Sequence, residues 1–93
     1  MVIFTWDEGK RRENLKKHGV DFQDAAEMFT GPMLVRLDAR EDYGEDRFLG
    51  YGFIQGMLMA IIFTEPEPDT IRVISLRKAS KNEQAHFEKE IRN

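Results

Sequence analysis

The chain has 93 residues, no cysteine and a formal net charge of −3, so we expect one domain (1–93) without disulfides, thiolate nucleophiles or cysteine-bound zinc. With 33% charged and 41% hydrophobic residues, the composition is that of a globular chain and excludes intrinsic disorder. No apolar run approaches the roughly 20 residues that span a bilayer, and the first residues lack a signal-peptide pattern, so we expect a soluble, cytoplasmic protein without a membrane partner.

The first third of the sequence predicts a strand followed by two helices. The β-branched and aromatic run VIFTW, residues 2–6, is typical of a strand. Asp7 can cap a helix that extends to residue 18, where a glycine follows. Asp21 opens a second helix that a Gly-Pro pair ends. The apolar residues of this second helix that recur at helical spacing, and are therefore predicted to face the core, are Phe22, Ala25, Ala26 and Phe29.

Four apolar runs then predict antiparallel strands, and they occupy residues 33–37, 47–54, 57–64 and 70–77. Gln55-Gly56 is a hairpin signal, whereas the two prolines of EPEPD break the next connection. The stretch SKNE is a capping box for a last helix that ends near Arg92. The sequence therefore predicts the α+β class, with an antiparallel sheet packed by an N-terminal helix pair and a C-terminal helix.

The basic residues are concentrated in two segments, and acidic residues fill the middle of the chain. A net negative charge argues against nucleic acid, because phosphate contacts come from Lys and Arg. A basic patch is compatible with this total only if the two segments meet in the fold. The segments contain Lys10, Arg11, Arg12, Lys16 and Lys17 in the first helix, and Arg72, Arg77, Lys78 and Lys81 near the end.

The stretch DAREDYGEDR, residues 38–47, combines seven charged side chains with one Tyr-Gly pair. It is either a solvated hairpin connection or a source of acid, base and phosphate-binding groups. Strand alternation places Ser75 and Arg77 on one face, together with Ile71 and Val73. It also places Arg47 on the side of Leu49, Tyr51 and Phe53, opposite two glycines that would let another element approach closely.

Three stretches carry a resemblance to a known family, and they are FTWDEGKRRENLKKHGVDFQDAAEMF, DAREDYGEDRFLGYG and IRVISLRKASKNE. Together they resemble the BrnT family of bacterial type II toxins, and the resemblance runs over nearly the whole chain. It implies a RelE-like fold and a metal-independent endoribonuclease without a cofactor, whose cleavage of RNA shuts down translation. It also implies a BrnA-like antitoxin with a ribbon-helix-helix part, through which the complex, and not the toxin alone, binds operator DNA.

Cutting RNA by attack of its own 2′-hydroxyl requires a base, an acid and cations that stabilise charge on phosphorus. Arg77 is the first candidate for the phosphate, because a guanidinium fork binds two phosphate oxygens, and Arg47 is the second. Candidates for proton transfer are Glu45, His18 and Lys17. Glu45 is either a base or half of a salt bridge with Arg47, and His18 is either a titrating group or a partner for the helix dipole.

Further residues are predicted to contact RNA or its phosphates, namely Lys10, Asn14, Tyr43, Ser75, Lys78 and Lys81. With only two histidines and no cysteine, no metal centre is expected.

One departure from the family bears on the mechanism. Many members resemble one another in a tyrosine of the last helix, where this chain has Phe87. Phenylalanine has no hydroxyl, so a proton-transfer role does not carry over to it, and we expect it to hold the helix down. This departure keeps an alternative function open, namely a non-catalytic binding module that acts in a regulatory complex with a DNA-binding partner.

Overall fold

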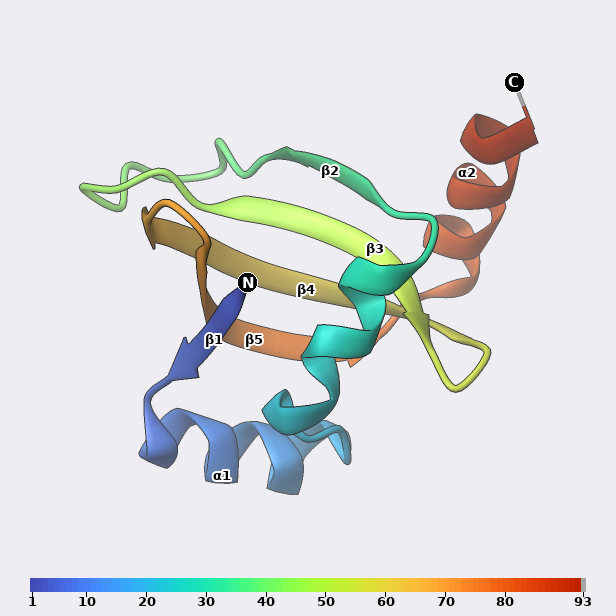
Figure 1. Ribbon diagram of the computed structural model, residues 1–93. Helices are drawn as coiled ribbons and strands as arrows, with labels where there is room; N and C mark the ends of the chain where they lie inside the picture. Colours follow the sequence, from blue (N-terminus) through green and yellow to red (C-terminus); the bar gives the residue numbers. More distant parts are fainter. Residues whose placement is uncertain (93) are drawn as a thin grey trace.

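The computed structural model describes residues 1–92 and consists of a five-stranded sheet with helical segments on both sides (Figure 1). The strands lie in the order β1-β5-β4-β3-β2. None of the helices in the described part of the chain is long and apolar enough to cross a membrane. In chain order the elements are β1 (Ile3–Trp6), α1 (Glu8–His18), η1 (Phe22–Thr30), β2 (Leu34–Leu37), β3 (Phe48–Ile54), β4 (Met57–Glu67), β5 (Thr70–Lys78) and α2 (Lys81–Arg92).

The α+β class and the order of elements confirm the sequence prediction, with one difference in the sheet. β2, β3, β4 and β5 are antiparallel neighbours, as predicted, but β1 runs parallel to β5. The sheet is therefore mixed. The apolar pattern of residues 2–6 indicates a strand, whereas its partner and direction depend on long-range pairing that a local pattern does not encode.

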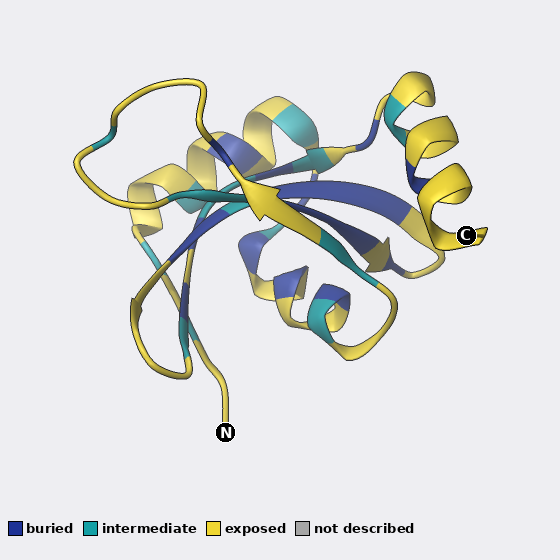
Figure 2. Cartoon of the chain, turned by 90° about the horizontal axis from the view of Figure 1, so that it is seen from above, coloured by how far each residue is buried: buried dark blue, intermediate teal, exposed yellow. Residues whose placement is uncertain are grey.

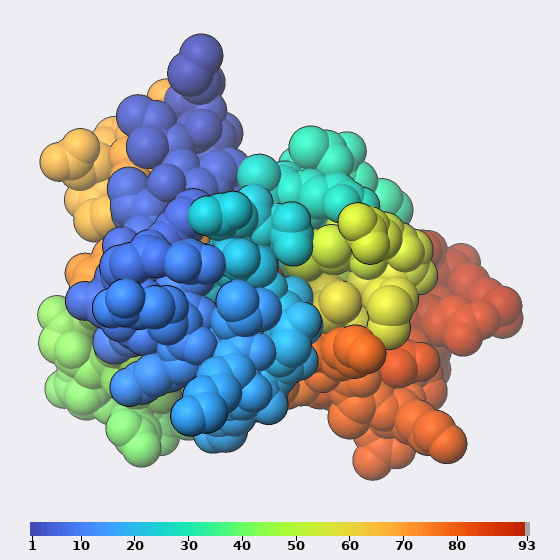
Figure 3. Space-filling view, turned by 90° about the horizontal axis from the view of Figure 1, so that it is seen from below, coloured from blue at the N-terminus to red at the C-terminus, as the bar shows by residue number. Residues whose placement is uncertain are grey.

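Two apolar clusters lie on opposite faces of the sheet. The larger one contains Met59, Ile61 and Phe63 of β4 and is covered by η1, and we call this side the core face. The smaller one contains the alternating residues Leu58 and Ala60 and is covered at one end of the sheet by α2. Seen from above, the central strands are buried and the 38–47 segment is mostly exposed (Figure 2). Seen from below, α1 and η1 lie side by side (Figure 3).

The second predicted helix is a 3-10 helix, η1. Its buried residues are Phe22, Ala25 and Met28, at intervals of three, which is the period of a 3-10 helix. The prediction that Ala26 faces the core was wrong, because that residue is exposed. Phe29 is half-buried and packs against Phe4 and Phe63.

Two glycines of β3 allow neighbouring segments to lie close to the sheet, as the sequence predicted, and one of these segments is η1. A Cβ atom at Gly52 would stand 3.2 Å from the backbone oxygen of Met28. One at Gly50 would stand 2.7 Å from the methyl group of Met33. A larger residue at position 52 would therefore push η1 away from β3, whereas one at position 50 would displace the Met33 side chain.

The pairing of β4 with β5 contains an irregularity that corrects the predicted faces. Ile62 pairs with Ser75 but Phe63 pairs with Val73, so Ile74 is an extra residue in β5. Ile71 and Val73 therefore lie on the core face with Leu76, and the prediction that Ser75 and Arg77 share their face was wrong. Ser75 and Arg77 do lie together, on the opposite face.

The connection between β4 and β5 is shorter than predicted. β4 continues through Glu65, Pro66 and Glu67, and the turn consists of Pro68 and Asp69. A second register shift between Thr64 and Glu67 makes room for the proline, which lacks a backbone donor.

α1 is fixed to the edge of β5 by a single side chain. β1 pairs with β5 only as far as Val73, so the last residues of β5 have no strand on that side. The Nδ2 of Asn14 donates to the backbone oxygens of Leu76 (2.7 Å) and Val20 (3.1 Å). The backbone N–H of Leu76 donates to the Oδ1 of Asn14 (3.2 Å). The carboxamide thus replaces the missing strand's peptide group.

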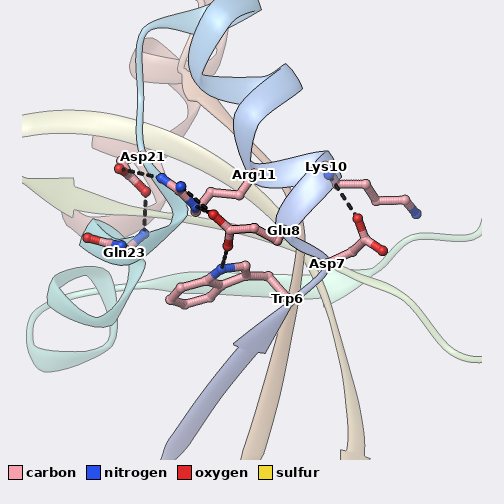
Figure 4. Close-up of polar contacts among 7 residues, drawn as sticks. All are labelled: Trp6, Asp7, Glu8, Lys10, Arg11, Asp21 and Gln23. Atoms are coloured by element: carbon pink, nitrogen blue, oxygen red, sulfur yellow. Dashed lines mark hydrogen bonds and ion pairs between the residues drawn. The ribbon is translucent and has the colours of Figure 1, made fainter.

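The starts of α1 and η1 are held by polar contacts (Figure 4). Asp7 and Asp21 cap the two helices, as predicted, by accepting from the N–H groups of Lys10 and Gln23. The guanidinium of Arg11 bridges Glu8 and Asp21, which lie at the starts of these helices. This bridge sets how α1 and η1 lie relative to each other.

α2 is anchored at its first turn by the carboxylate of Glu83. The predicted capping box is confirmed, since the Ser80 N–H donates to Glu83 (2.8 Å) and the Glu83 N–H to the Ser80 hydroxyl (3.2 Å). The same carboxylate accepts from Arg77 (2.7 and 3.0 Å) and from the Tyr51 hydroxyl (2.8 Å). Phe87 is buried against Phe53 and holds the helix down, as expected.

Replacing Asn14 by Ala is predicted to lower the free energy of unfolding by about 2–4 kcal/mol, because backbone groups of Leu76 and Val20 lose buried partners. Urea denaturation measures this change. The exposed neighbour Glu13 is the control, and its replacement by Ala should change stability by less than about 0.5 kcal/mol. An unchanged unfolding free energy for Asn14→Ala would show that water can replace the Asn14 hydrogen bonds to the backbone groups of Leu76 and Val20.

Glu83→Gln keeps a capping side chain but removes the negative charge. Its hydrogen bond with Arg77 holds the pKa of the Glu83 carboxyl far below its usual range. A carboxyl with a lowered folded pKa stabilises the protein above its unfolded pKa, near 4.3, and loses this contribution as the pH falls. The variant should therefore be about 1–2 kcal/mol less stable at pH 7, a figure discounted for partial exposure of the pair, and the deficit should shrink toward pH 3.

Unfolding midpoints from pH 7 to pH 3 measure this dependence. Glu88→Gln is the matched control, since Glu88 pairs with Arg92 on the exposed side of the same helix. It should be nearly neutral at every pH. A deficit for Glu83→Gln that does not depend on pH would contradict the role of its charge.

Candidate functional site

α2 covers one end of its sheet face, and the strands beyond it remain accessible. We call this uncovered part the open face. Strand pairing brings four strands together there, because directly opposite residues of antiparallel strands project to the same side. Its residues are Arg36 of β2, Leu49 of β3, Ala60 and Ile62 of β4, and Ser75 and Arg77 of β5.

A pocket of about 120 Å³ lies on the open face. Leu49, Ala60 and Ile62 supply its apolar lining. Its polar groups are the Ser75 hydroxyl and the side chains of Arg40 and Arg77. Two guanidinium groups beside a hydroxyl and an apolar surface are suited to a phosphate group with an attached nucleoside.

Arg77 lies at the boundary between the open face and α2. Its two terminal nitrogens donate to the Glu83 carboxylate, and these hydrogen bonds raise the pKa of the guanidinium. The positive charge of Arg40 opposes this rise in the pKa of Arg77, so the two cations lie close enough to repel each other. The Arg77 side chain is 41% exposed, and an anion bound there would share it with Glu83.

Arg40 is held in place by a buried carboxylate. Its Nε and one terminal nitrogen donate to Asp38 at 2.8 and 2.9 Å. The Asp38 side chain is 2% exposed and that of Arg40 is 69% exposed. This hydrogen bond, despite burial, holds the pKa of the Asp38 carboxyl below its usual range. Asp38 thus orients an exposed cation toward the pocket, a role that the charge pattern of residues 38–47 did not single out.

Tyr43, Glu45 and Arg47 form a second cluster in the same segment. The guanidinium carbon of Arg47 lies 4.1 Å from the centre of the Tyr43 ring, a cation–π contact. The Nε of Arg47 lies 3.6 Å from a carboxylate oxygen of Glu45, is buried and makes no hydrogen bond. The structure therefore brings together three residues that the sequence selected. Within residues 1–92, no hydrogen bond or ion pair joins them to Arg77.

Tyr51 and Glu83 are residues that the sequence did not select. The Tyr51 hydroxyl donates to Glu83, and burial together with this carboxylate raises the pKa of the phenol. Strand alternation did place Tyr51 on the side of Leu49. Glu83, in contrast, showed only a capping signal, because its contact with Tyr51 of β3 spans 32 residues and its contact with Arg77 depends on how β5 turns into α2.

A second pocket, of about 140 Å³, lies between β2, β3 and α2, beside the Tyr51–Glu83 pair. Its polar side chains are Arg36, Tyr51, His86 and Glu90. A larger groove, of about 580 Å³, lies on the other side of α2 and is lined mainly by apolar side chains, such as Phe53, Met57 and Ile91. No group of three His, Asp or Glu residues that could hold a metal ion occurs in residues 1–92.

The remaining predicted residues lie on α1 and around the start of α2. Lys10, Lys17 and His18 belong to α1, and Asn14 binds the backbone beside Arg77. The two basic segments therefore meet at the edge of β5, as a basic patch requires.

Lys17 and His18 follow Asn14 by three and four residues and lie on its side of the helix. They make no hydrogen bond or ion pair with Arg77 in the described structure. Lys78 and Lys81 are exposed on either side of the β5–α2 junction.

Comparisons with known proteins agree with this geometry. Residues 6–83 match the family model described as the ribonuclease toxin BrnT of type II toxin–antitoxin systems. The chain is also similar to the ribonuclease toxin BrnT of Brucella abortus, whose crystal structure it matches with 32% identity and a TM-score of 0.68. The match covers 87% of this chain and all of that one. A comparison with curated proteins found no match. The chain therefore belongs to the BrnT family of ribonuclease toxins of type II toxin–antitoxin systems.

Proposed function

We propose that this BrnT toxin is a metal-independent endoribonuclease that cleaves RNA at the open face and thereby inhibits translation. The observation that carries the proposal is the 120 Å³ pocket, in which Arg40, Ser75 and Arg77 converge on an apolar surface. RNA is a polyanion, and guanidinium groups bind its phosphates in a fork geometry. The negative total charge of the chain does not oppose this binding, because both arginines lie on one local surface.

The reaction that fits these residues uses the 2′-hydroxyl of the RNA as the nucleophile, so the protein need only position the phosphate and move protons. Arg77 and Arg47 are proposed to bind the phosphate and to stabilise the charge that develops on it. Glu45 is proposed as the base for the 2′-hydroxyl, since 41% of its side chain is exposed and its ion pair with Arg47 is loose, at 3.6 Å. Lys17 and His18 are proposed to take part in proton transfer from the end of α1, which lies beside the edge of β5.

Other predicted residues would extend the RNA-binding surface. Tyr43 offers a ring face next to Arg47, and Ser75 lines the pocket beside Arg77. Lys10, Asn14, Lys78 and Lys81 are proposed as further contacts. In Asn14, however, the carboxamide is already bonded to backbone groups, so any contribution to RNA binding acts through the position of α1.

As the toxin of a type II system, the protein has a cognate antitoxin. We propose that this antitoxin is a BrnA-like protein with a ribbon-helix-helix part, and that operator DNA is bound only through it. The acidic total charge of the toxin supports this division, because DNA binding depends on many phosphate contacts from Lys and Arg.

Arg77→Ala is predicted to lower kcat/KM for RNA cleavage about 10²–10³-fold through loss of charge stabilisation at phosphorus. Glu45→Gln is predicted to lower kcat by a factor on the order of 10² or more through loss of the base. Neither variant should arrest growth when it is induced without antitoxin. Arg12→Ala is the control, since it removes one exposed arginine on α1 and should retain full activity.

The assay uses purified toxin and RNA in the presence of EDTA, because metal-independent cleavage must persist when divalent cations are chelated. Circular dichroism checks that each variant is folded. If the wild-type protein leaves RNA intact and does not arrest growth, the proposed function is wrong. Tight antitoxin binding without any cleavage would favour the alternative of a regulatory binding module.

The proposed antitoxin is tested by coexpressing the toxin with a ribbon-helix-helix protein encoded next to its gene. Growth should be restored, the two proteins should copurify, and only the complex should shift a DNA fragment from the promoter. A shift of equal strength with the toxin alone would contradict the proposed division of roles.

A further inference from the structure

His86 is a titratable side chain on the side of α2 that faces the sheet beside the open face. It lines the 140 Å³ pocket together with Tyr51, Leu49 and Arg36. Leu49 also lines the 120 Å³ pocket, which contains Arg77, so the two pockets adjoin. His86 is exposed, whereas the next residue, Phe87, is buried in the contact with β3. α2 thus presents an imidazole, and no phenol, to this part of the sheet.

The spacing along α2 brings His86 close to the phosphate-binding group. Glu83 and His86 are three residues apart, so their Cβ atoms lie about 5–6 Å apart on the same side of the helix. The Glu83 carboxylate is hydrogen-bonded to both terminal nitrogens of Arg77. A phosphate held by Arg77 therefore lies within about one helical turn of the imidazole ring. The leaving 5′-oxygen of the RNA extends from that phosphate and can occupy part of the space between them.

We propose that His86 is a catalytic residue of this toxin and acts as the general acid for the departing RNA strand. This inference rests on the proposed ribonuclease function. The bond between phosphorus and the 2′-oxygen forms while the bond to the 5′-oxygen breaks. The 2′-hydroxyl proton goes to the base, and the protonated imidazole of His86 gives a proton to the 5′-oxygen. The products are a 2′,3′-cyclic phosphate and a 5′-hydroxyl end.

The charges around His86 fit this role. Glu83 and Glu90 lie one turn before and after it on α2, and Glu90 lines the same pocket. The Glu83 carboxylate is already paired with Arg77, so Glu90 is the carboxylate that attracts a positively charged ring. From the sheet, β2 contributes Arg36, β3 contributes Tyr51, and β5 contributes Arg77, whose charge is compensated by Glu83. A negatively charged RNA phosphate entering this space adds to the attraction.

His86→Gln is predicted to lower kcat about 10²–10⁴-fold with little change in KM, because substrate binding is left intact. A general acid must be protonated, so wild-type kcat should fall as the pH rises through the range in which histidine titrates, about pH 5–8. This fall should be absent in His86→Gln. His18→Gln is the matched comparison, since it changes the other histidine of the chain.

A second measurement separates an acid from a base or a structural group. The cleavage site is first mapped with wild-type toxin, and a short RNA is made with sulfur in place of the bridging 5′-oxygen at that site. A thiolate leaves without protonation. His86→Gln should therefore cleave this RNA at a rate within about tenfold of the wild-type rate, whereas Arg77→Ala should not regain activity on it.

The outcomes distinguish this inference from the function on which it rests. If wild-type toxin does not cleave RNA, the proposed function fails. If wild-type toxin cleaves RNA and His86→Gln retains its kcat, only the role of His86 is overturned. The role is also overturned if His18→Gln, rather than His86→Gln, removes the fall at alkaline pH, or if sulfur substitution fails to rescue a folded His86→Gln variant.

Discussion

The carboxylate of Glu83 is the contact on which the candidate site depends. It belongs to the first turn of α2 and accepts hydrogen bonds from the preceding Ser80 N–H, from Arg77 of β5 and from Tyr51 of β3, so it fixes three elements at one point. It also neutralises Arg77 while no RNA is bound. If a phosphate draws the guanidinium away, Glu83 still has Ser80 and Tyr51 as partners. α2 can therefore stay packed on the sheet while Arg77 exchanges the Glu83 carboxylate for a phosphate.

The core face of the sheet is tightly packed, and the candidate site lies on the opposite face. On the core face, Phe63 packs against Phe29 and Phe48, and η1 lies directly on Gly52 of β3. Strands that are packed this closely on one side hold their opposite side chains in fixed positions. The opposite side needs little cover of its own, and the small residues Ala60 and Ser75 leave room for a ligand.

Much of the fold followed from local sequence signals, because caps, the capping box and the Gln55-Gly56 turn depend on near neighbours. The parallel direction of β1 and the extra residue Ile74 did not, since they depend on how strands pair with one another. The 3-10 form of η1 did not either, since this helix is packed against β3 and β5, which are distant in sequence. The site followed the same division. Tyr43, Glu45 and Arg47 come from one short stretch, so the sequence selected all three, whereas the link from Arg77 to Tyr51 passes through Glu83 and required the tertiary structure.

The Asn14 contact with Leu76 also has a consequence for the protein in solution. An unpaired strand edge offers N–H and C=O groups to any other extended chain and so invites intermolecular sheet growth. β1 is too short to cover β5, and the Asn14 carboxamide occupies the Leu76 groups that it leaves. One side chain thus closes this border of the sheet against aggregation, a safeguard that matters most when the toxin is produced in excess.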